Sequence, residues 1–302
     1  MHAPTETVPT EALPTYAAPS DGRLSAEMVA AYRDAGVLIL EGFASEAACR
    51  ELRAQALELV DGFDPGQATS VFSTTHKEHL DDRYFIESGD KIRFFLEQGA
   101  FDDAGALRAS KADCLNKMGH ALHELDPVFA RFSRTPALAE LGRRLGLRDP
   151  GLIQSMYIFK PPRIGGEVLW HQDSTFLYTE PESCVGFWFA VEEATLDNGC
   201  MYFIPGGHRG PLRQRNYRTG PYSLQTDVLD SSPWPEERAL PAPARVGTLV
   251  IFDGRTPHRS GVNHTSSSRH AYTLHAIERG CHYPAENWLQ RPDMPLRGFE
   301  PS

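Results

Sequence analysis

Short runs of β-branched and aromatic residues, separated by Gly and Pro turns, fill the second half of this chain. Runs of this kind, at regular intervals, indicate a β-sandwich or a β-barrel. Double-sheet jelly rolls, which include the cupins, are the relevant class. The expected strands lie at 152–160, 167–173, 185–195, 200–204, 247–252, 256–262 and 270–278.

The first half predicts helices ahead of this mainly β core. Ser25 and Ser45 are typical residues for helix N-termini, and apolar residues follow each at helical spacing. We expect a single domain over residues 23–302, with core strands at about 152–278, after a mobile tail at 1–22 rich in Pro, Thr and Ala. The expected helices lie at 25–36, 45–61, about 113–132 and 135–146, and the expected strands of this half at 37–40 and 91–96.

The amino-acid composition limits the kinds of partner that we expect this protein to bind. The 302 residues carry a net charge of −10, which argues against nucleic acid as the main partner, because phosphate binding needs a basic face. No apolar run approaches the length of a membrane span, and the N-terminus lacks a signal-peptide pattern. The 5 cysteines are scattered without metal-type spacing, which indicates reduced thiols and a cytoplasmic protein.

The most specific candidate site is the triplet His171-Gln172-Asp173 at the end of an apolar run. On a strand, residues i and i+2 point to the same side, so His171 and Asp173 can reach one ion while Gln172 faces away. His258 follows another buried run and supplies the second imidazole. Two histidines and one carboxylate form the open-sided site of non-heme Fe(II) oxygenases. The alternative is a surface loop or a hydrogen-bonded pair without metal.

Arg269 stands at the head of the last predicted strand. Its planar guanidinium could clamp a dicarboxylate. Ser260 could hydrogen-bond the same carboxylate, and turn capping is the competing interpretation. His275 shares strand parity with Arg269 and could face the interior, where we expect it to bond to backbone.

Residues 209–245 interrupt the strand rhythm with many Pro, Arg and polar residues. Long irregular connections on barrels commonly carry function. We expect this insert to form a lid or wall of the substrate pocket. Its four arginines could meet an anionic substrate, or they could belong to a solvated loop; they are Arg209, Arg213, Arg215 and Arg218.

The sequence resembles the phytanoyl-CoA dioxygenase family of Fe(II)/2-oxoglutarate oxygenases over roughly residues 25–290. The resemblance implies a double-stranded β-helix with the iron on His171, Asp173 and His258, and with Arg269 on the distal carboxylate of 2-oxoglutarate. One departure is a segment between Pro181 and Trp188 that is about one residue shorter than the family pattern. The stretches that carry the resemblance are Ser88–Phe95, Asn116–His123, Gln154–Lys160, His171–Asp173, Phe176–Pro181, Ala194–Cys200 and Glu286–Gln290.

The resemblance also assigns Lys117, Met156 and Trp188 to the cosubstrate pocket. From the residues alone, Lys117 is a solvated lysine on a predicted helix. By the same reasoning, Met156 and Trp188 are ordinary core residues.

The function that this resemblance implies is a dioxygenase that uses Fe(II), 2-oxoglutarate and O2. It would hydroxylate a C–H bond of a small molecule and release succinate and CO2. A carboxylate at Asp173 favours hydroxylation over halogenation. The substrate could be an acyl-CoA or another hydrophobic or anionic metabolite. Two alternatives remain open, a cupin-type metalloenzyme that does not use 2-oxoglutarate and a non-catalytic ligand-binding module on the same fold.

Overall fold

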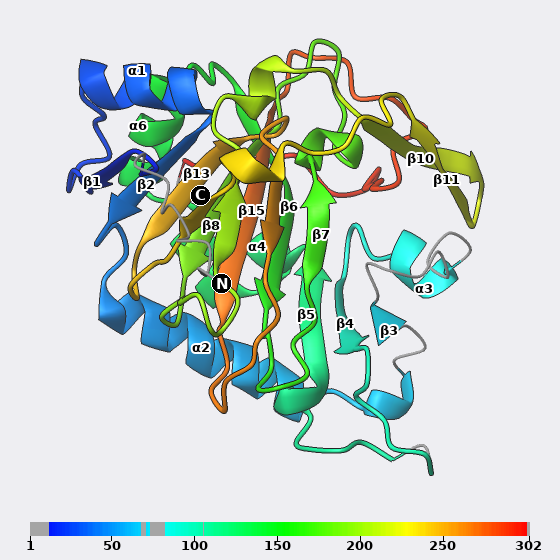
Figure 1. Cartoon of the computed structure of the whole chain (residues 1–302). Coiled ribbons are helices and arrows are strands. Elements are labelled where there is room, and N and C mark those ends of the chain that lie inside the picture. Colours follow the sequence, from blue (N-terminus) through cyan, green and yellow to red (C-terminus); the bar gives the residue numbers. More distant parts are fainter. Residues whose placement is uncertain (1–11, 68–70, 73–81, 105, 301–302) are drawn as a thin grey trace, which may run out of the picture.

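Two β-sheets that enclose a common core form the centre of the molecule (Figure 1). The structure is a computed structural model and describes residues 12–67, 71–72, 82–104 and 106–300. In spatial order the larger sheet contains β1 (Thr15–Ala17), β2 (Val37–Glu41), β13 (Leu249–Asp253), β8 (Val185–Ala190), β15 (Ala271–Glu278), β6 (Pro150–Ile158), β5 (Leu115–His120), β4 (Ile92–Glu97) and β3 (Val71–Phe72). The smaller sheet contains β12 (Leu240–Ala242), β9 (Met201–Phe203), β14 (His258–Ser260) and β7 (Val168–His171). The predicted jelly-roll core is thereby confirmed.

Alternation along β8 shows how the larger sheet separates two cores. Phe187 and Phe189 pack in the cluster that contains the helices, whereas Trp188 packs in the cluster between the sheets. Met201 and Phe203 of the smaller sheet belong to this second cluster. Since successive strand residues point to opposite faces, one face of β8 is covered by helices and the other faces the interior of the jelly roll.

Helices cover the outer face of the larger sheet. Cys49 and Leu52 on α2 are buried there, and Cys49 Sγ lies 3.8 Å from the carbonyl oxygen of Ala190 in β8. Ser25 and Ser45 cap the first two helices through side-chain hydrogen bonds, as the sequence predicts. The helices are α1 (Ala26–Ala35), α2 (Glu46–Asp61), α3 (Arg83–Ile86), α4 (Leu122–Leu125), α5 (Pro127–Ser133) and α6 (Pro136–Leu145).

The expected mobile tail is wrong for its second half. Thr15–Ala17 form β1, which pairs in parallel with β2 at the edge of the larger sheet. Leu13 just before it is 5% exposed and packs between the sheets. Burial of this apolar side chain and the strand pairing fix the segment against the entropy of a free chain. Residues 1–11 lie outside the described residues.

The expected helix at 113–132 is also wrong in its first part. Leu115–His120 form β5, which pairs with β4 on one side and β6 on the other. Two short helices, α4 and α5, follow it. Pairing on both edges overrides the weak local preference of a sequence without β-branched residues. Lys117 therefore lies on a central strand with its side chain buried, and it is not a solvated helix residue.

The insert 209–245 is more regular than expected. It contains an antiparallel hairpin of β10 (Gln214–Gly220) and β11 (Ser223–Val228), which projects at the right of Figure 1. Farther along, β12 joins the smaller sheet by pairing with β9. The side chain of Gln172 donates to the carbonyl oxygen of Pro211 and accepts from the backbone N–H of Arg213, and these two bonds hold the start of the insert beside His171 and Asp173.

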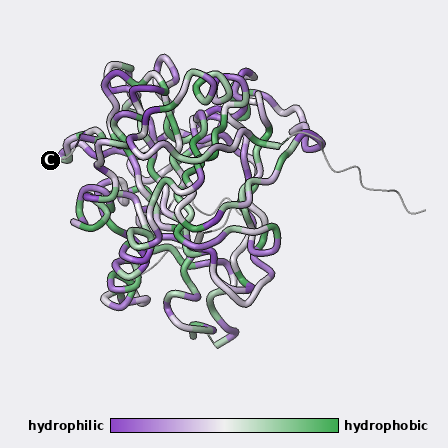
Figure 2. Tube along the Cα trace, turned by 90° about the vertical axis from the view of Figure 1, so that its left-hand side faces the viewer, coloured by the Kyte–Doolittle hydropathy of each residue, from purple (hydrophilic) through white to green (hydrophobic). Residues whose placement is uncertain are grey.

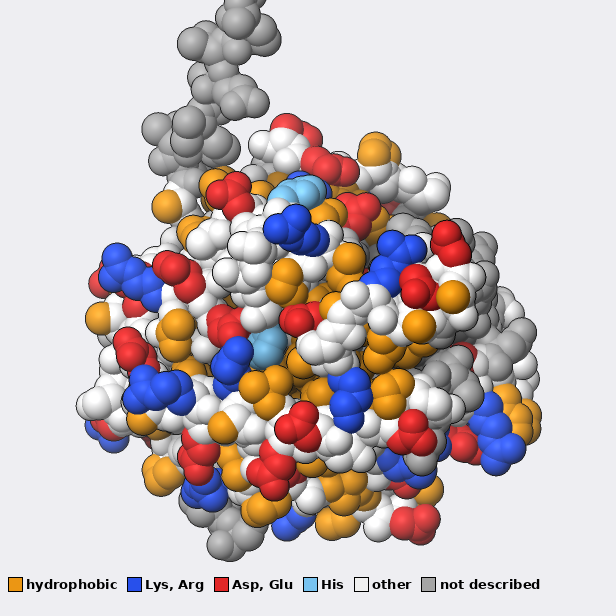
Figure 3. All heavy atoms as spheres, turned by 90° about the horizontal axis from the view of Figure 1, so that it is seen from below, with side chains coloured by type: hydrophobic (Ala, Val, Ile, Leu, Met, Phe, Trp, Pro, Cys, Tyr) orange, Lys and Arg blue, Asp and Glu red, His pale blue; other side chains and the backbone are white. Residues whose placement is uncertain are grey.

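The exterior carries charges of both signs. On the face shown in Figure 3, acidic and basic side chains are interspersed with hydrophobic ones. Hydrophilic and hydrophobic segments alternate over short distances along the trace in Figure 2. Within the described residues, the helices all lack the length and apolar character that crossing a membrane would require.

Arg218 of the hairpin joins three distant parts of the chain. Its guanidinium donates to the carbonyl oxygens of Trp288, at 2.6 and 2.9 Å, and Ile86, at 3.0 Å. We expect Arg218→Ala to lower the free energy of unfolding by about 1–3 kcal/mol, because hydrogen bonds from a charged donor are lost. Urea denaturation would measure it. The control is Arg209→Ala, whose ion pair with Asp34 is exposed and should contribute little. Equal effects of both substitutions would contradict the role of Arg218.

Candidate metal centre

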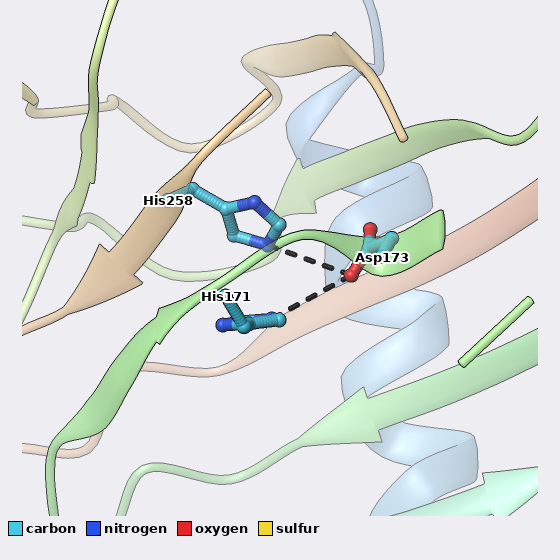
Figure 4. A group of neighbouring side chains, drawn as sticks. All are labelled: His171, Asp173 and His258. Carbon is cyan, nitrogen blue, oxygen red and sulfur yellow. Dashed lines mark ion pairs between the residues drawn. The ribbon is translucent and has the colours of Figure 1, made fainter. Parts of the chain in front are cut away.

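Two histidines and one aspartate meet where β7 and β14 pair (Figure 4). His171 ends β7, Asp173 begins the 3-10 turn η4 (Asp173–Thr175), and His258 begins β14. The antiparallel register sets His258 directly opposite His171, with ring centroids 4.2 Å apart. Asp173 Oδ1 lies 3.5 Å from His171 Nε2 and 3.6 Å from His258 Nε2. The structure therefore brings together the three residues that the sequence singled out.

The hydrogen bonds behind each imidazole decide which nitrogen faces Asp173. His171 Nδ1 lies 2.8 Å from the carbonyl oxygen of Leu169, and His258 Nδ1 lies 3.0 Å from that of Thr256. A carbonyl oxygen only accepts, so each Nδ1 carries the proton and donates. Both Nε2 atoms are then left with a free lone pair that points toward Asp173. Backbone partners of this kind fix the tautomer of metal-binding histidines.

The charge states of Asp173 and His258 suit a cation. Burial alone would raise the pKa of Asp173, but the surrounding histidines, first His275 and then His258, hold it well below its usual range. Burial, followed by repulsion from His171, lowers the pKa of His258 to about 4. At neutral pH, Asp173 is thus an anion and His258 a neutral base, which are the forms that bind metal.

Gln172 faces away from the three residues, as predicted. Its amide nitrogen donates to the carbonyl oxygens of Arg255 at 2.8 Å and Pro211 at 3.2 Å. Its amide oxygen accepts from the backbone of Arg213 at 2.9 Å. With these three bonds, Gln172 fixes the orientation of the strand end that carries His171 and Asp173.

A cavity adjoins the three residues, and it is lined by all the residues that the family resemblance or the sequence suggested for the cosubstrate. They come from four strands of the two sheets and from the loop before β15, namely Lys117, Met156, Trp188, Ser260 and Arg269. Asp173 is the one acidic residue among the described residues that line it. Four basic side chains line it as well, Lys117, Lys160, Arg259 and Arg269. A cavity with this imbalance favours an anionic ligand.

Burial lowers the pKa of three of these basic groups. Burial lowers the pKa of Lys117 to about 7. Burial and then the charge of Arg269 lower the pKa of Lys160 to about 7. Burial also lowers the pKa of Arg269 to about 10. An anion in the cavity would reverse these shifts, since an opposite charge favours the protonated form.

Arg269 has unused hydrogen-bonding capacity. The residue is 2% exposed, and its Nε and Nη1 have no hydrogen-bond partner among the described residues. The guanidinium lies 5.4 Å from the ring centroid of Trp188. Buried donors without partners are costly, so their presence indicates a ligand that supplies acceptors.

The sequence missed several lining residues. Lys160 is 3% exposed and donates to Ser260 Oγ at 3.1 Å. Strand parity with Met156 could have found it, because both lie on the inward face of β6 or its continuation. His275 faces the interior, but the expected backbone bond is wrong, since its Nε2 lies 2.9 Å from Asp173 Oδ2. Other lining residues missed are Phe85, His120, Phe176, Leu177 and Trp288.

The four arginines of the insert do not line this cavity. Arg209 pairs with Asp34, and Arg213 stacks on Trp234 with 3.9 Å from its guanidinium carbon to the ring centroid. Arg215 donates to the side chain of Asn287 at 2.5 Å. The expectation that the cluster meets an anionic substrate is therefore corrected, because these arginines bind groups of the protein itself.

A model of the family described as Phytanoyl-CoA dioxygenase (PhyH) matches residues 32–271 of this chain. The chain belongs to the phytanoyl-CoA dioxygenase family. A relative from Arabidopsis thaliana named phytanoyl-CoA dioxygenase is 43% identical over 275 residues, which are 91% of this chain and 96% of that protein. The phytanoyl-CoA dioxygenase domain-containing protein 1 of Danio rerio is 43% identical over 276 residues, 88% of this chain and 95% of that protein.

Solved structures share the fold at low sequence identity. The non-heme alpha ketoglutarate dependent carbocyclase SnoK superposes with a TM-score of 0.64 at 19% identity, over 93% of this chain and 96% of that one. EctD from S. alaskensis, solved with 2-oxoglutarate and 5-hydroxyectoine, superposes with a TM-score of 0.61 at 20% identity, over 99% of this chain and 95% of that one. The epimerase SnoN, in complex with Fe3+, alpha ketoglutarate and nogalamycin RO, superposes with a TM-score of 0.60 at 18% identity, over 91% of this chain and 94% of that one. For this member of the phytanoyl-CoA dioxygenase family, they confirm the jelly-roll fold.

The buried amine of Lys117 should make the ligand-free protein less stable. Its ordinary pKa in an unfolded chain is about 10.4. Because the folded value is about 7, the unfolded state binds more protons between these values, and stability rises with pH over this range. We expect Lys117→Met to raise the free energy of unfolding at pH 7 by roughly 2–4 kcal/mol. The gain should shrink as the pH approaches 10.

Urea denaturation of both proteins at several pH values would measure this. Lys91→Met is the control, because the Lys91 side chain is 47% exposed and pairs with Asp90. A Lys117→Met variant that is less stable than the wild type at every pH would contradict the assigned cost of burial.

Proposed function

We propose that this chain is an Fe(II)- and 2-oxoglutarate-dependent dioxygenase that hydroxylates a C–H bond of a small molecule, with release of succinate and CO2. The observation that carries the proposal is the meeting, in one cavity, of the His171–Asp173–His258 group with Arg269, whose buried donors lack partners. Membership of the phytanoyl-CoA dioxygenase family supports the reaction class. The names of the structural neighbours, which include ketoglutarate-dependent enzymes, are consistent with it.

The three side chains fit Fe(II). Each offers one ligand atom, and these atoms lie within 4.8 Å of one another. Two neutral imidazole nitrogens and one carboxylate are the ligand set of non-heme Fe(II) oxygenases, which leave positions open for other ligands. His171, Asp173 and His258 would hold the ion, and the backbone bonds to both Nδ1 atoms would keep the rings in place.

The basic end of the cavity fits a dicarboxylate. Arg269 presents a guanidinium whose free N–H groups can bind two carboxylate oxygens. Ser260, hydrogen-bonded to Lys160, can add a hydroxyl contact to the same carboxylate. The neutral side chains Met156 and Trp188 would flank the cosubstrate, while Lys117 supplies a further positive charge.

Fe(II) and 2-oxoglutarate, when bound, supply the activation of O2 and the oxidation of the C–H bond. The chain's own residues bind, orient and exclude water. Arg269 and Ser260 would bind the distal carboxylate of the cosubstrate and so set its position. Trp188 and Phe252 are buried in the core between the sheets, so the part of the cavity that they line is free of solvent.

The remaining wall of the cavity is aromatic and suits an apolar part of the substrate. Phe85 and Trp288 are stacked with ring centroids 4.5 Å apart. Phe176, 37% exposed, lies against His171 at a centroid distance of 6.3 Å. Because the arginines of the insert are engaged within the protein, a hydrophobic metabolite is favoured over a CoA ester.

Loss of any of the three proposed ligands should abolish turnover. We expect His171→Ala, Asp173→Ala and His258→Ala to eliminate Fe(II)-dependent formation of succinate, because two remaining ligands hold the ion poorly. Anaerobic titration of 2-oxoglutarate into Fe(II)-loaded wild type should produce a visible metal-to-ligand charge-transfer band, which the variants should lack. The exposed His264 provides the control, His264→Ala. A wild type that binds Fe(II) without this band would favour the cupin-type alternative.

The planar shape of the Arg269 guanidinium should contribute to the affinity for 2-oxoglutarate in addition to its charge. Arg269→Lys keeps one positive charge but loses the planar fork. We expect the apparent affinity for 2-oxoglutarate to fall by about 1.5–3 kcal/mol, which is roughly 10- to 100-fold. The Michaelis constant for 2-oxoglutarate, from succinate formation, measures this. Arg245→Lys, at an exposed position, is the control. An unchanged Michaelis constant in Arg269→Lys would argue against the clamp.

A further inference from the structure

His275 contacts the one carboxylate of the metal centre from the side opposite the two histidines. We propose that His275 is a positioning residue, which holds one oxygen of Asp173 so that only the other is available to the metal. The inference rests on the proposed function, since it assumes that Asp173 binds the ion. Neither the sequence pattern nor the comparisons assign a role to this histidine.

The two oxygens of Asp173 have separate partners. Oδ1 lies 3.5 and 3.6 Å from the Nε2 atoms of His171 and His258. Oδ2 lies 2.9 Å from His275 Nε2, which is an ordinary hydrogen-bond length. The carboxylate is thus oriented with one oxygen toward the site where the ion would bind and the other toward β15.

The chemistry of the two groups determines which of them donates the hydrogen bond between His275 and Asp173. A carboxylate that binds a metal through its other oxygen can only accept, so in the 2.9 Å contact the proton lies on His275 Nε2. An oxygen that already accepts a charge-assisted hydrogen bond is a poorer second ligand for a cation. Asp173 would then occupy one coordination position instead of two, which leaves more of the metal for the cosubstrate and O2.

The strand that carries His275 is hydrogen-bonded on both edges, which holds His275 in a fixed position. His275 lies in β15, between β6 and β8, where its neighbours are Gln154 and Gly186. Its side chain is 5% exposed. Asp173, by contrast, lies in η4 directly after β7 of the smaller sheet. The hydrogen bond therefore ties the ligand-bearing turn to the central strands of the larger sheet.

A purely structural hydrogen bond is the competing explanation, and metal binding separates the two. The probe is Co(II), added to metal-free protein without 2-oxoglutarate and followed by its visible absorption. We expect His275→Phe, which keeps a ring but has no donor, to weaken Co(II) binding by about 10- to 100-fold, the range for lost outer contacts of metal ligands. The absorption bands should also change, because Asp173 is free to bind through both oxygens.

Conservative variants test whether the donor itself matters. His275→Gln places an amide N–H about where the imidazole Nε2–H stands, so we expect Co(II) affinity within about threefold of the wild type and an unchanged spectrum. His275→Asn has the same amide on a shorter side chain and should behave like His275→Phe. The comparison of Gln with Asn keeps the test decisive even where His275→Phe does not fold.

A matched control lies on the adjoining segment. His270 is buried just before β15 and bonds to the hydroxyl of Tyr157 at 2.8 Å, away from the metal centre. His270→Phe should leave Co(II) affinity unchanged, with thermal unfolding of each metal-free variant as the check of folding. The positioning role is refuted if His275→Gln and His275→Asn bind Co(II) with the same affinity. It is also refuted if His270→Phe weakens Co(II) binding as much as His275→Phe does.

The same titration distinguishes failure of the proposed function. His258→Ala removes a proposed ligand and should abolish Co(II) binding. If wild type and His258→Ala bind Co(II) equally, the metal centre itself is wrong. If His258→Ala loses binding but His275→Phe retains the affinity and spectrum of the wild type, the metal centre stands and the role of His275 falls.

Discussion

The antiparallel register of β7 and β14 sets His171 opposite His258, and the rest of the site is arranged around this pair. A slip of one residue would turn one imidazole to the outer face of the smaller sheet. β14 is also held on its other edge, where His258 pairs with Phe203 of β9. Backbone ladders on both sides of β14 therefore determine the separation of the two rings before any metal is present.

Three buried cationic side chains of the cavity lower the stability of the ligand-free protein. Lys117, Lys160 and Arg269 are each buried, and burial lowers the pKa of each group. Such groups reduce the stability of the ligand-free protein, because charges are removed from water without full compensation. A bound dianion would restore this lost free energy. The cost in the free state would thus favour binding of a negatively charged ligand.

Local patterns in the sequence predicted the parts of the site that depend on strand alternation. The orientation of His171 and Asp173 toward one side follows from a period of two. Lys117 was placed on a helix, because its strand is stabilised by β4 and β6 and not by its own residues. The partner of His275 could not be predicted, since Asp173 belongs to the other sheet and only the packed fold brings them together.

The three hydrogen bonds of Arg218 have a consequence for how this molecule can change over evolution. They attach Trp288, Ile86 and the hairpin to one another through backbone carbonyls, so the aromatic wall beside the cavity depends little on the identity of neighbouring side chains. The proposed metal ligands lie instead on two strands of the smaller sheet and in the turn after β7. Substitutions in the wall can therefore reshape the substrate pocket while the chemical centre is inherited intact.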